Sequence, residues 1–142
     1  ETQHKLIHRL FAKIDTAKDR IIELEEDHTE EAEVVVISYG ITMRVAERAI
    51  QMECTEGIAT GKLRLITVWP LAEERIRELA GRVKAFVVPE LNMGQVVLEV
   101  ERVTGGRTRV IRVPHAGGTV HKPEQILEAI RRGAMTVQGA GA

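Results

Sequence analysis

The sequence predicts an α/β fold in which a mainly parallel β-sheet carries helices on both faces. After an N-terminal helix, segments typical of strands and helices alternate four times along the 142 residues. The clearest strand is Val34-Val35-Val36-Ile37, a β-branched run typical of a strand that is buried on both faces. A helix that crosses over between two strands makes these strands parallel, and such crossovers are right-handed.

The N-terminal part is expected to be one helix and a connector. Residues 4–18 place apolar side chains at helical spacing. Residues 21–24 either continue this helix or break away as a short edge strand. Residues 23–31 are dense in acids, and we expect a solvated connector there, because the acids lack the spaced Asp, Asn and Gly of a calcium loop. The chain starts in the middle of an amphipathic pattern, so we expect a piece of a longer polypeptide.

Four strand–helix pairs are expected after the connector. The strands are placed at residues 34–37, 63–68, 84–89 and 107–113, and the helices at 42–58, 71–82, 93–103 and 123–133. Thr42 and Asn92 are expected as N-caps, with Gln95 reaching back to Asn92, and Pro70 in a first helical turn. The expected division is a helix and acidic connector at 1–31, an α/β domain at 32–133 and a flexible tail at 134–142.

Composition excludes several classes of protein. The net charge of −1 and four scattered aromatic residues give no basis for nucleic-acid binding. The single cysteine, Cys54, excludes an internal disulfide and a cluster held by cysteines, and we expect it to be a small buried hydrophobe. With no apolar run of about 20 residues and no signal-peptide pattern, a cytoplasmic protein is expected.

The most informative polar residues follow the third strand of residues 84–89. Glu90, Asn92 and Gln95 lie where ligands and partners gather, at the carboxyl end of a strand. Glu90 suits a general acid or base, yet no carboxylate or histidine partner is near it in sequence. The alternatives are a structural carboxylate bonded to turn N–H groups and a contact to another domain.

Other candidate sites are weaker. The loop at residues 115–121 contains Gly117-Gly118, which could let the backbone approach a ligand, and is either a flexible connector or an interface. His4 and His8 are four residues apart on a helix but lack a third ligand, so no metal site is expected. The sequence has no phosphate-binding loop, dinucleotide fingerprint or nucleophile elbow.

Three short pieces, in this order and spacing, resemble a known family. Ser38-Tyr39-Gly40 follows the first strand, Trp69-Pro70 the second, and Glu90-x-Asn92-x-Gly94-Gln95 the third. Together they resemble the second domain of alpha subunits of 2-oxoacid:ferredoxin oxidoreductases over about residues 32–131. The last piece is the most specific and looks closer to 2-oxoglutarate enzymes than to pyruvate enzymes.

The resemblance implies a fold like the C-terminal domain of transketolase. That fold has three layers, α/β/α, on a mainly parallel five-stranded sheet whose first strand is antiparallel, which would place residues 21–26 in that strand. The family's enzymes convert a 2-oxoacid, coenzyme A and oxidised ferredoxin to an acyl-CoA, carbon dioxide and reduced ferredoxin, using thiamine diphosphate, Mg²⁺ and iron–sulfur clusters.

The resemblance assigns this chain an assembly role without catalytic residues. Its cofactors are expected in a thiamine-binding beta subunit, in other subunits, or in a part that precedes Glu1, and ferredoxin would be an indirect partner. None of the cofactors is expected in this chain. The expected interface residues lie at the carboxyl edge of the sheet: Tyr39, Gly40, Trp69, Pro70, Glu90, Asn92, Gly94, Gln95, Gly117 and Gly118.

Two other functions stay open. One is a stand-alone doubly wound module that binds a small anion through Arg44, Arg112 and the Gly117-Gly118 loop. The other is the C-terminal domain of a different thiamine enzyme, such as a transketolase, which the Glu90–Gln95 piece argues against.

Overall fold

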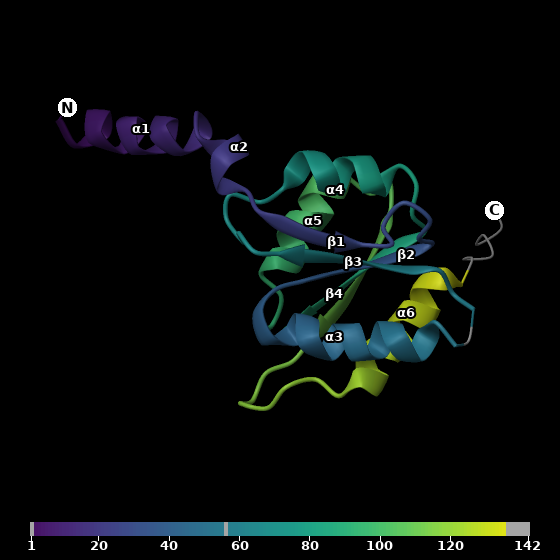
Figure 1. Cartoon of the computed structure of the whole chain (residues 1–142). Coiled ribbons are helices and arrows are strands. Elements are labelled where there is room, and N and C mark those ends of the chain that lie inside the picture. Colours follow the sequence, from purple (N-terminus) through teal and green to yellow (C-terminus); the bar gives the residue numbers. More distant parts are fainter. Residues whose placement is uncertain (1, 56, 136–142) are drawn as a thin grey trace, which may run out of the picture.

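The computed structural model describes residues 2–55 and 57–135 of the chain (Figure 1). Helices and strands alternate along most of this length. In chain order they are α1 (Thr2–Asp15), α2 (Lys18–Ile21), β1 (Leu24–Asp27), β2 (Val34–Ser38), α3 (Gly40–Glu53), β3 (Thr60–Leu65), α4 (Glu73–Ala80), β4 (Ala85–Glu90), α5 (Val96–Thr104), β5 (Arg109–Pro114) and α6 (Pro123–Ala134).

The five strands form one sheet in the order β1-β3-β2-β4-β5. Strand β1 runs antiparallel to β3, with Leu24 opposite Leu65, and the other pairs are parallel. The expected fold class, a mainly parallel five-stranded sheet with an antiparallel first strand, is therefore confirmed. The first strand is shorter than the expected residues 21–26, because α2 extends to Ile21.

Helices cover both faces of the sheet, which gives three layers (Figure 1). On one face, Val35 and Ile37 of β2 pack into a core with side chains of α4 and α5. On the other face, Val34 and Val36 pack with α3 and α6. The alternation along β2 explains why this run has no polar residue, since each face of the strand meets a helical layer.

The expectation that the acidic segment at residues 23–31 is a solvated connector is wrong. Part of it is strand β1, and its carboxylates bind cations of neighbouring elements. Glu25 accepts a hydrogen bond from Lys62 at 2.8 Å, and Glu26 takes two from Arg75, each at 2.8 Å. Arg82 and Arg75 both bind Glu30 and lower the pKa of its carboxyl to about 2. The acids thus fasten an edge strand.

Several expected boundaries also differ. Helix α3 ends at Glu53 rather than near residue 58, so Cys54 follows the helix and is exposed instead of buried. Thr42 lies buried inside α3 and is no N-cap. Pro70 precedes α4, which begins at Glu73, and follows Trp69 through a cis peptide bond. Strand β5 is half exposed because it is an edge strand.

The two ends of the chain add little to the core. Helix α1 projects away from the sheet and buries none of its residues (Figure 1). Of the tail expected at 134–142, Ala134 belongs to α6, and residues 136–142 lie outside the described residues. The division at residue 31 stays a prediction, although the sheet itself reaches back to Leu24.

Candidate functional site

At the carboxyl edge of the sheet, the strand order reverses between β2 and β4. From β2 the chain crosses to β3 on one side, and from β3 it crosses back to β4 on the other side of β2. Such a reversal of strand order is where α/β sheets place their sites. Ser38 ends β2 and Glu90 ends β4, so the residues that follow both strands meet there.

Glu90 is the centre of this position, with only 1% of its surface exposed. Its carboxylate accepts the backbone N–H of Gln95 at 3.1 Å, of Val96 at 2.9 Å and of Val97 at 2.9 Å. These N–H groups open helix α5 and have no partner within the helix. A negative charge at this end is also favoured by the helix dipole. Glu90 is therefore the cap of α5.

The expectation that Asn92 caps the helix after β4 is wrong. Helix α5 begins at Val96 rather than at Met93, and Asn92 accepts the N–H of Gly94 at 2.7 Å within the preceding turn. Gln95 takes the N-cap position but makes no side-chain capping bond. The long reach of Glu90, six and seven residues ahead, replaces the local capping pattern that the sequence favours.

Tyr39 and Asn92 complete the polar cluster. The Tyr39 hydroxyl donates to Glu90 at 3.3 Å, and the Asn92 amide donates to Tyr39 at 3.2 Å and to Glu90 at 3.2 Å. Burial raises the pKa of the Tyr39 hydroxyl, and the negative charge of Glu90 raises it further. Ser38, part of the first sequence piece but not among the expected interface residues, ties the two strands by donating to the Pro89 carbonyl at 3.0 Å.

The polar groups of this cluster form hydrogen bonds with one another and with the start of α5. The N-terminus of a helix is a natural anion site, and here a side chain of the same domain already fills it. Glu90 is enclosed and bonded on both oxygens, which favours the structural carboxylate over a general acid or base. Arg112, which the small-anion alternative requires, is bound by Glu101 through bonds of 2.7 and 2.5 Å. These contacts argue against that alternative.

The other expected interface residues lie on separate loops of the same edge. Gly40 begins α3 with a φ of 57°, a conformation that glycine adopts without strain. Gly94 has a φ of 104°, and a Cβ there would lie 2.9 Å from Val97. Gly117 and Gly118 follow β5, in the loop that holds His115 and His121. His121 is 2% exposed and bonds the Val113 carbonyl, while its Nδ1 has no hydrogen-bond partner among the described residues.

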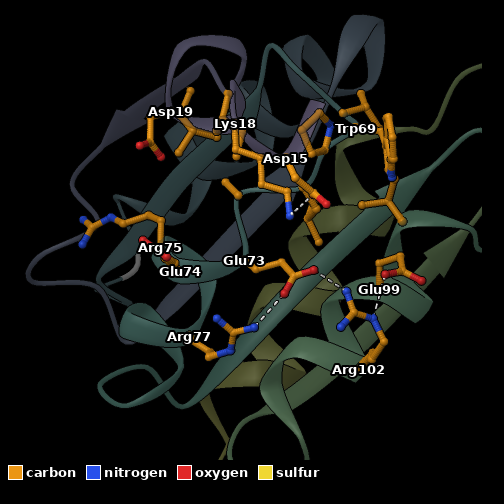
Figure 2. Close-up of a pocket in the computed structure, with 17 residues that line it drawn as sticks. Asp15, Lys18, Asp19, Trp69, Glu73, Glu74, Arg75, Arg77, Glu99 and Arg102 are labelled. Atoms are coloured by element: carbon orange, nitrogen blue, oxygen red, sulfur yellow. Dashed lines mark hydrogen bonds and ion pairs between the residues drawn. The ribbon is translucent and has the colours of Figure 1, made fainter. Parts of the chain in front are cut away.

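Trp69 and Pro70 line a groove of about 500 Å³ between the chain after β3, helix α2 and the starts of α4 and α5 (Figure 2). Several of its charged side chains pair with one another. Glu73 binds Arg77 and Arg102, each at 2.6 Å, and Lys18 binds Asp15 at 2.9 Å. The groove therefore presents an apolar wall with a polar rim whose charges are partly paired.

Exposed apolar side chains form the feature that sequence reasoning missed. Of the fourteen large apolar side chains exposed in the described residues, seven follow the carboxyl ends of the four parallel strands: Ile41, Ile66, Val68, Trp69, Leu91, Met93 and Val120. We call this set the apolar edge. Of this set only Trp69 was expected at an interface from the sequence, and the strand order brings all seven residues to one side of the sheet.

No metal or membrane feature adds to the site. Within residues 2–55 and 57–135, no group of three or more His, Cys, Asp or Glu side chains is placed to hold a metal ion. Among the described helices, none has the length and apolar character that a membrane crossing needs.

Comparison with known proteins bears on the resemblance. The sequence pattern of the pyruvate:ferredoxin oxidoreductase core domain II family matches residues 32–126. The chain is 40% identical over 130 residues to the 2-oxoglutarate synthase subunit KorA of Methanothermobacter thermautotrophicus, and 38% identical to that of Methanocaldococcus jannaschii. Each of these two alignments covers 92% of this chain and 35% of the relative, so the chain spans about a third of these relatives' length.

Solved structures show the same fold. The 2-oxoglutarate:ferredoxin oxidoreductase of Magnetococcus marinus matches with a TM-score of 0.72 and 24% identity, over 95% of this chain and 24% of that one. A split-gene transketolase matches with a TM-score of 0.66 and 19% identity, over 78% of this chain and 42% of that one. The expected resemblance is confirmed, and the chain belongs to the family of pyruvate:ferredoxin oxidoreductase core domain II.

Proposed function

We propose that this chain is an assembly domain of a 2-oxoglutarate:ferredoxin oxidoreductase. In this enzyme a thiamine-binding beta subunit, or another part of the alpha subunit, would carry out the chemistry. The substrate choice is supported by the KorA relatives, which are named for 2-oxoglutarate synthase. The assembly role is supported by the apolar edge, which gathers exposed side chains after all four parallel strands.

The polar cluster supports binding of protein rather than of substrate. Glu90, Tyr39 and Asn92 bind one another and the start of α5, so the cluster is built to hold loops in place. Exposed contiguous apolar surface, in contrast, is typical of protein–protein contacts. The rigid cluster would fix the loops from which Leu91 and Met93 project, so that the edge meets its partner without further ordering.

The cofactors belong elsewhere in this proposal. Thiamine diphosphate, Mg²⁺ and iron–sulfur clusters would be held by partner subunits or by another part of the alpha subunit. An iron–sulfur cluster is held by several cysteine thiolates, and this chain has one cysteine. Ferredoxin would then meet the cluster-bearing subunit and contact this domain indirectly at most.

Co-purification with the thiamine-binding subunit of the source organism tests the assembly role. The chain would be co-expressed with that subunit under anaerobic conditions, and Met93→Ser together with Trp69→Ser would be compared with the parent. These side chains are 78% and 62% exposed, so the changes leave the core intact. We expect the double variant to lose at least about tenfold in affinity, as for residues at the centre of an interface.

Met135→Ser provides the matched control. Met135 is 66% exposed but lies at the other end of α6, away from the apolar edge. It should leave the complex unchanged. The purified complex is then assayed for reduction of a viologen dye that depends on 2-oxoglutarate and coenzyme A. Equal binding by the parent and the edge variant would refute the assembly role, and an active complex that prefers another 2-oxoacid would refute the substrate assignment.

A further inference from the structure

Two histidines of α1 face each other in a way that the proposed function does not use. His4 and His8 are four residues apart, so they lie on one face of the helix. Their Nε2 atoms are 3.1 Å apart, and their ring centroids are 4.2 Å apart with the planes tilted by 52°. Both side chains are exposed. Nothing in the core or the apolar edge explains this pair.

The separation of the two nitrogens fits two ligands of one metal ion. Zinc lies about 2.0–2.1 Å from a histidine nitrogen. For bond angles between those of octahedral and tetrahedral coordination, two such nitrogens are about 2.9–3.4 Å apart. The observed 3.1 Å lies within this range. This distance is compatible with both nitrogens binding one ion, once the rings turn so that their lone pairs converge on it.

The chemistry of the pair also suits a transition metal. In the metal-free pair, one Nε2–H donates to the lone pair of the other Nε2. To bind a metal through both Nε2 atoms, that ring moves its proton to Nδ1, and the pair loses no proton overall. Neutral imidazole is a preferred ligand of zinc, nickel and copper. The sequence alone predicts no metal site here, because a third ligand is missing, and none is placed nearby in the described residues, so water would fill the remaining positions.

We propose that His4 and His8 bind one divalent transition-metal ion, such as Zn²⁺ or Ni²⁺, and that the ion holds α1 in its helical form. The helix has 14 residues and buries none of them, so the rest of the domain supports it little. Isolated helices of this length are marginal in water. An ion that binds the helical arrangement and not the extended chain shifts the equilibrium toward the helix.

Calorimetric titration of the whole chain with ZnCl₂ or NiCl₂ tests this proposal. The chain carries no histidine tag and has Cys54→Ser throughout, because that thiol is exposed and could bind the same metals. We expect one ion per chain, together with a rise in helical circular dichroism at saturation. Absence of binding up to about 1 mM metal, which corresponds to a binding free energy weaker than about −4 kcal/mol, overturns the proposal.

A swapped variant provides the matched control. His8→Arg with Arg9→His keeps the composition and the charge but separates the two histidines by five residues, about 140° around the helix. Both positions are exposed, so the metal-free fold should not change. We expect affinity to fall at least about tenfold, which equals about 1.4 kcal/mol, and the gain in helicity to disappear. Equal affinity in the swapped chain would assign the metal to other residues and overturn the proposal.

Discussion

Glu90 shows how much one side chain can organise. Its carboxylate binds three backbone N–H groups of the α5 start and two side chains, while 1% of its surface is exposed. Glu90→Gln turns one oxygen into an N–H₂ group that faces N–H donors, so at least one donor loses its acceptor. We expect a loss of about 2–4 kcal/mol in the free energy of unfolding, measured with urea.

Glu124→Gln provides the comparison for that loss. Glu124 lies at the start of a helix too, in the first turn of α6, but it is exposed. Its replacement should cost less than about 0.5 kcal/mol, as for most surface changes. If both variants lost the same amount, the buried network of Glu90 would contribute nothing beyond a charge near a helix dipole.

Tyr39 allows a direct test of the same network, because it is the only tyrosine of the chain. Burial and the nearby Glu90 charge raise the pKa of its hydroxyl above the usual 10.0. Absorbance at 295 nm should therefore rise with a midpoint above pH 10 in the folded protein. The folded state favours the protonated phenol, so this contribution to stability is complete below pH 10 and is lost as the pH rises through the folded pKa.

Tyr39→Phe should remove that part of the alkaline loss of stability, as followed by urea unfolding at several pH values. A midpoint at or below the value in the unfolded chain would contradict the buried position of the hydroxyl beside Glu90.

At the level of single residues, the sequence located the cluster without settling its role. Glu90, Asn92 and Gln95 were recognisable because polar residues end an apolar strand. Whether Glu90 is catalytic or structural is decided by its bonds to the start of α5, and the N–H groups that it binds there lie six and seven residues further along the chain. Cys54 was misplaced for a similar reason, because the end of α3 decides its exposure and the nearest glycine, Gly57, lies four residues beyond the last helical residue, Glu53.

Strand β1 illustrates what sequence patterns miss at the level of elements. Its residues Leu24–Asp27 carry three acids, so neither alternation nor β-propensity identifies a strand. The strand exists because Lys62, Arg64 and Arg75 neutralise its acids and β3 supplies an edge. Strands β2 and β4 were found because each is a run of mostly apolar residues that needs no knowledge of its partner. Strand β3 begins at Thr60, three residues before the expected start at 63, because its first half carries Gly61 and Lys62.

A close packing contact beneath β1 makes Gly61 sensitive to replacement. A Cβ at Gly61 would lie 2.8 Å from the His28 carbonyl oxygen and 3.0 Å from the Thr29 Cα, both backbone atoms. The segment after β1 would have to move, so Gly61→Ala should cost about 1–3 kcal/mol in urea unfolding.

Gly81→Ala offers the opposite case. Gly81 has a φ of −77°, and its added Cβ would meet nothing closer than 3.4 Å. Because alanine has fewer unfolded conformations, this change should stabilise the domain by about 0.4–1 kcal/mol. A destabilisation as large as that of Gly61→Ala would mean that backbone contact is not what distinguishes the two positions.

At the level of the whole molecule, α1 and the α/β layers should be energetically separate. Helix α1 buries no residue, and it points away from the sheet (Figure 1). Removing residues 1–13 should therefore change the free energy of unfolding by less than about 0.5 kcal/mol. Urea unfolding of the shortened and full chains checks this. A larger loss would show that α1 packs on the domain in solution.

The order of strands in the sheet has a consequence for folding during synthesis. Strand β2 is made first among the parallel strands but lies in the centre, between β3 and β4. One edge of its run of Val34 to Ile37 thus stays unpaired until β3 has been made, and the other edge until β4, which ends at Glu90, has been added. Nascent apolar strands of this kind are prone to aggregate and to recruit chaperones. The acids just before β2 are therefore well placed as gatekeepers, that is, charged residues that hinder aggregation of the unfinished chain.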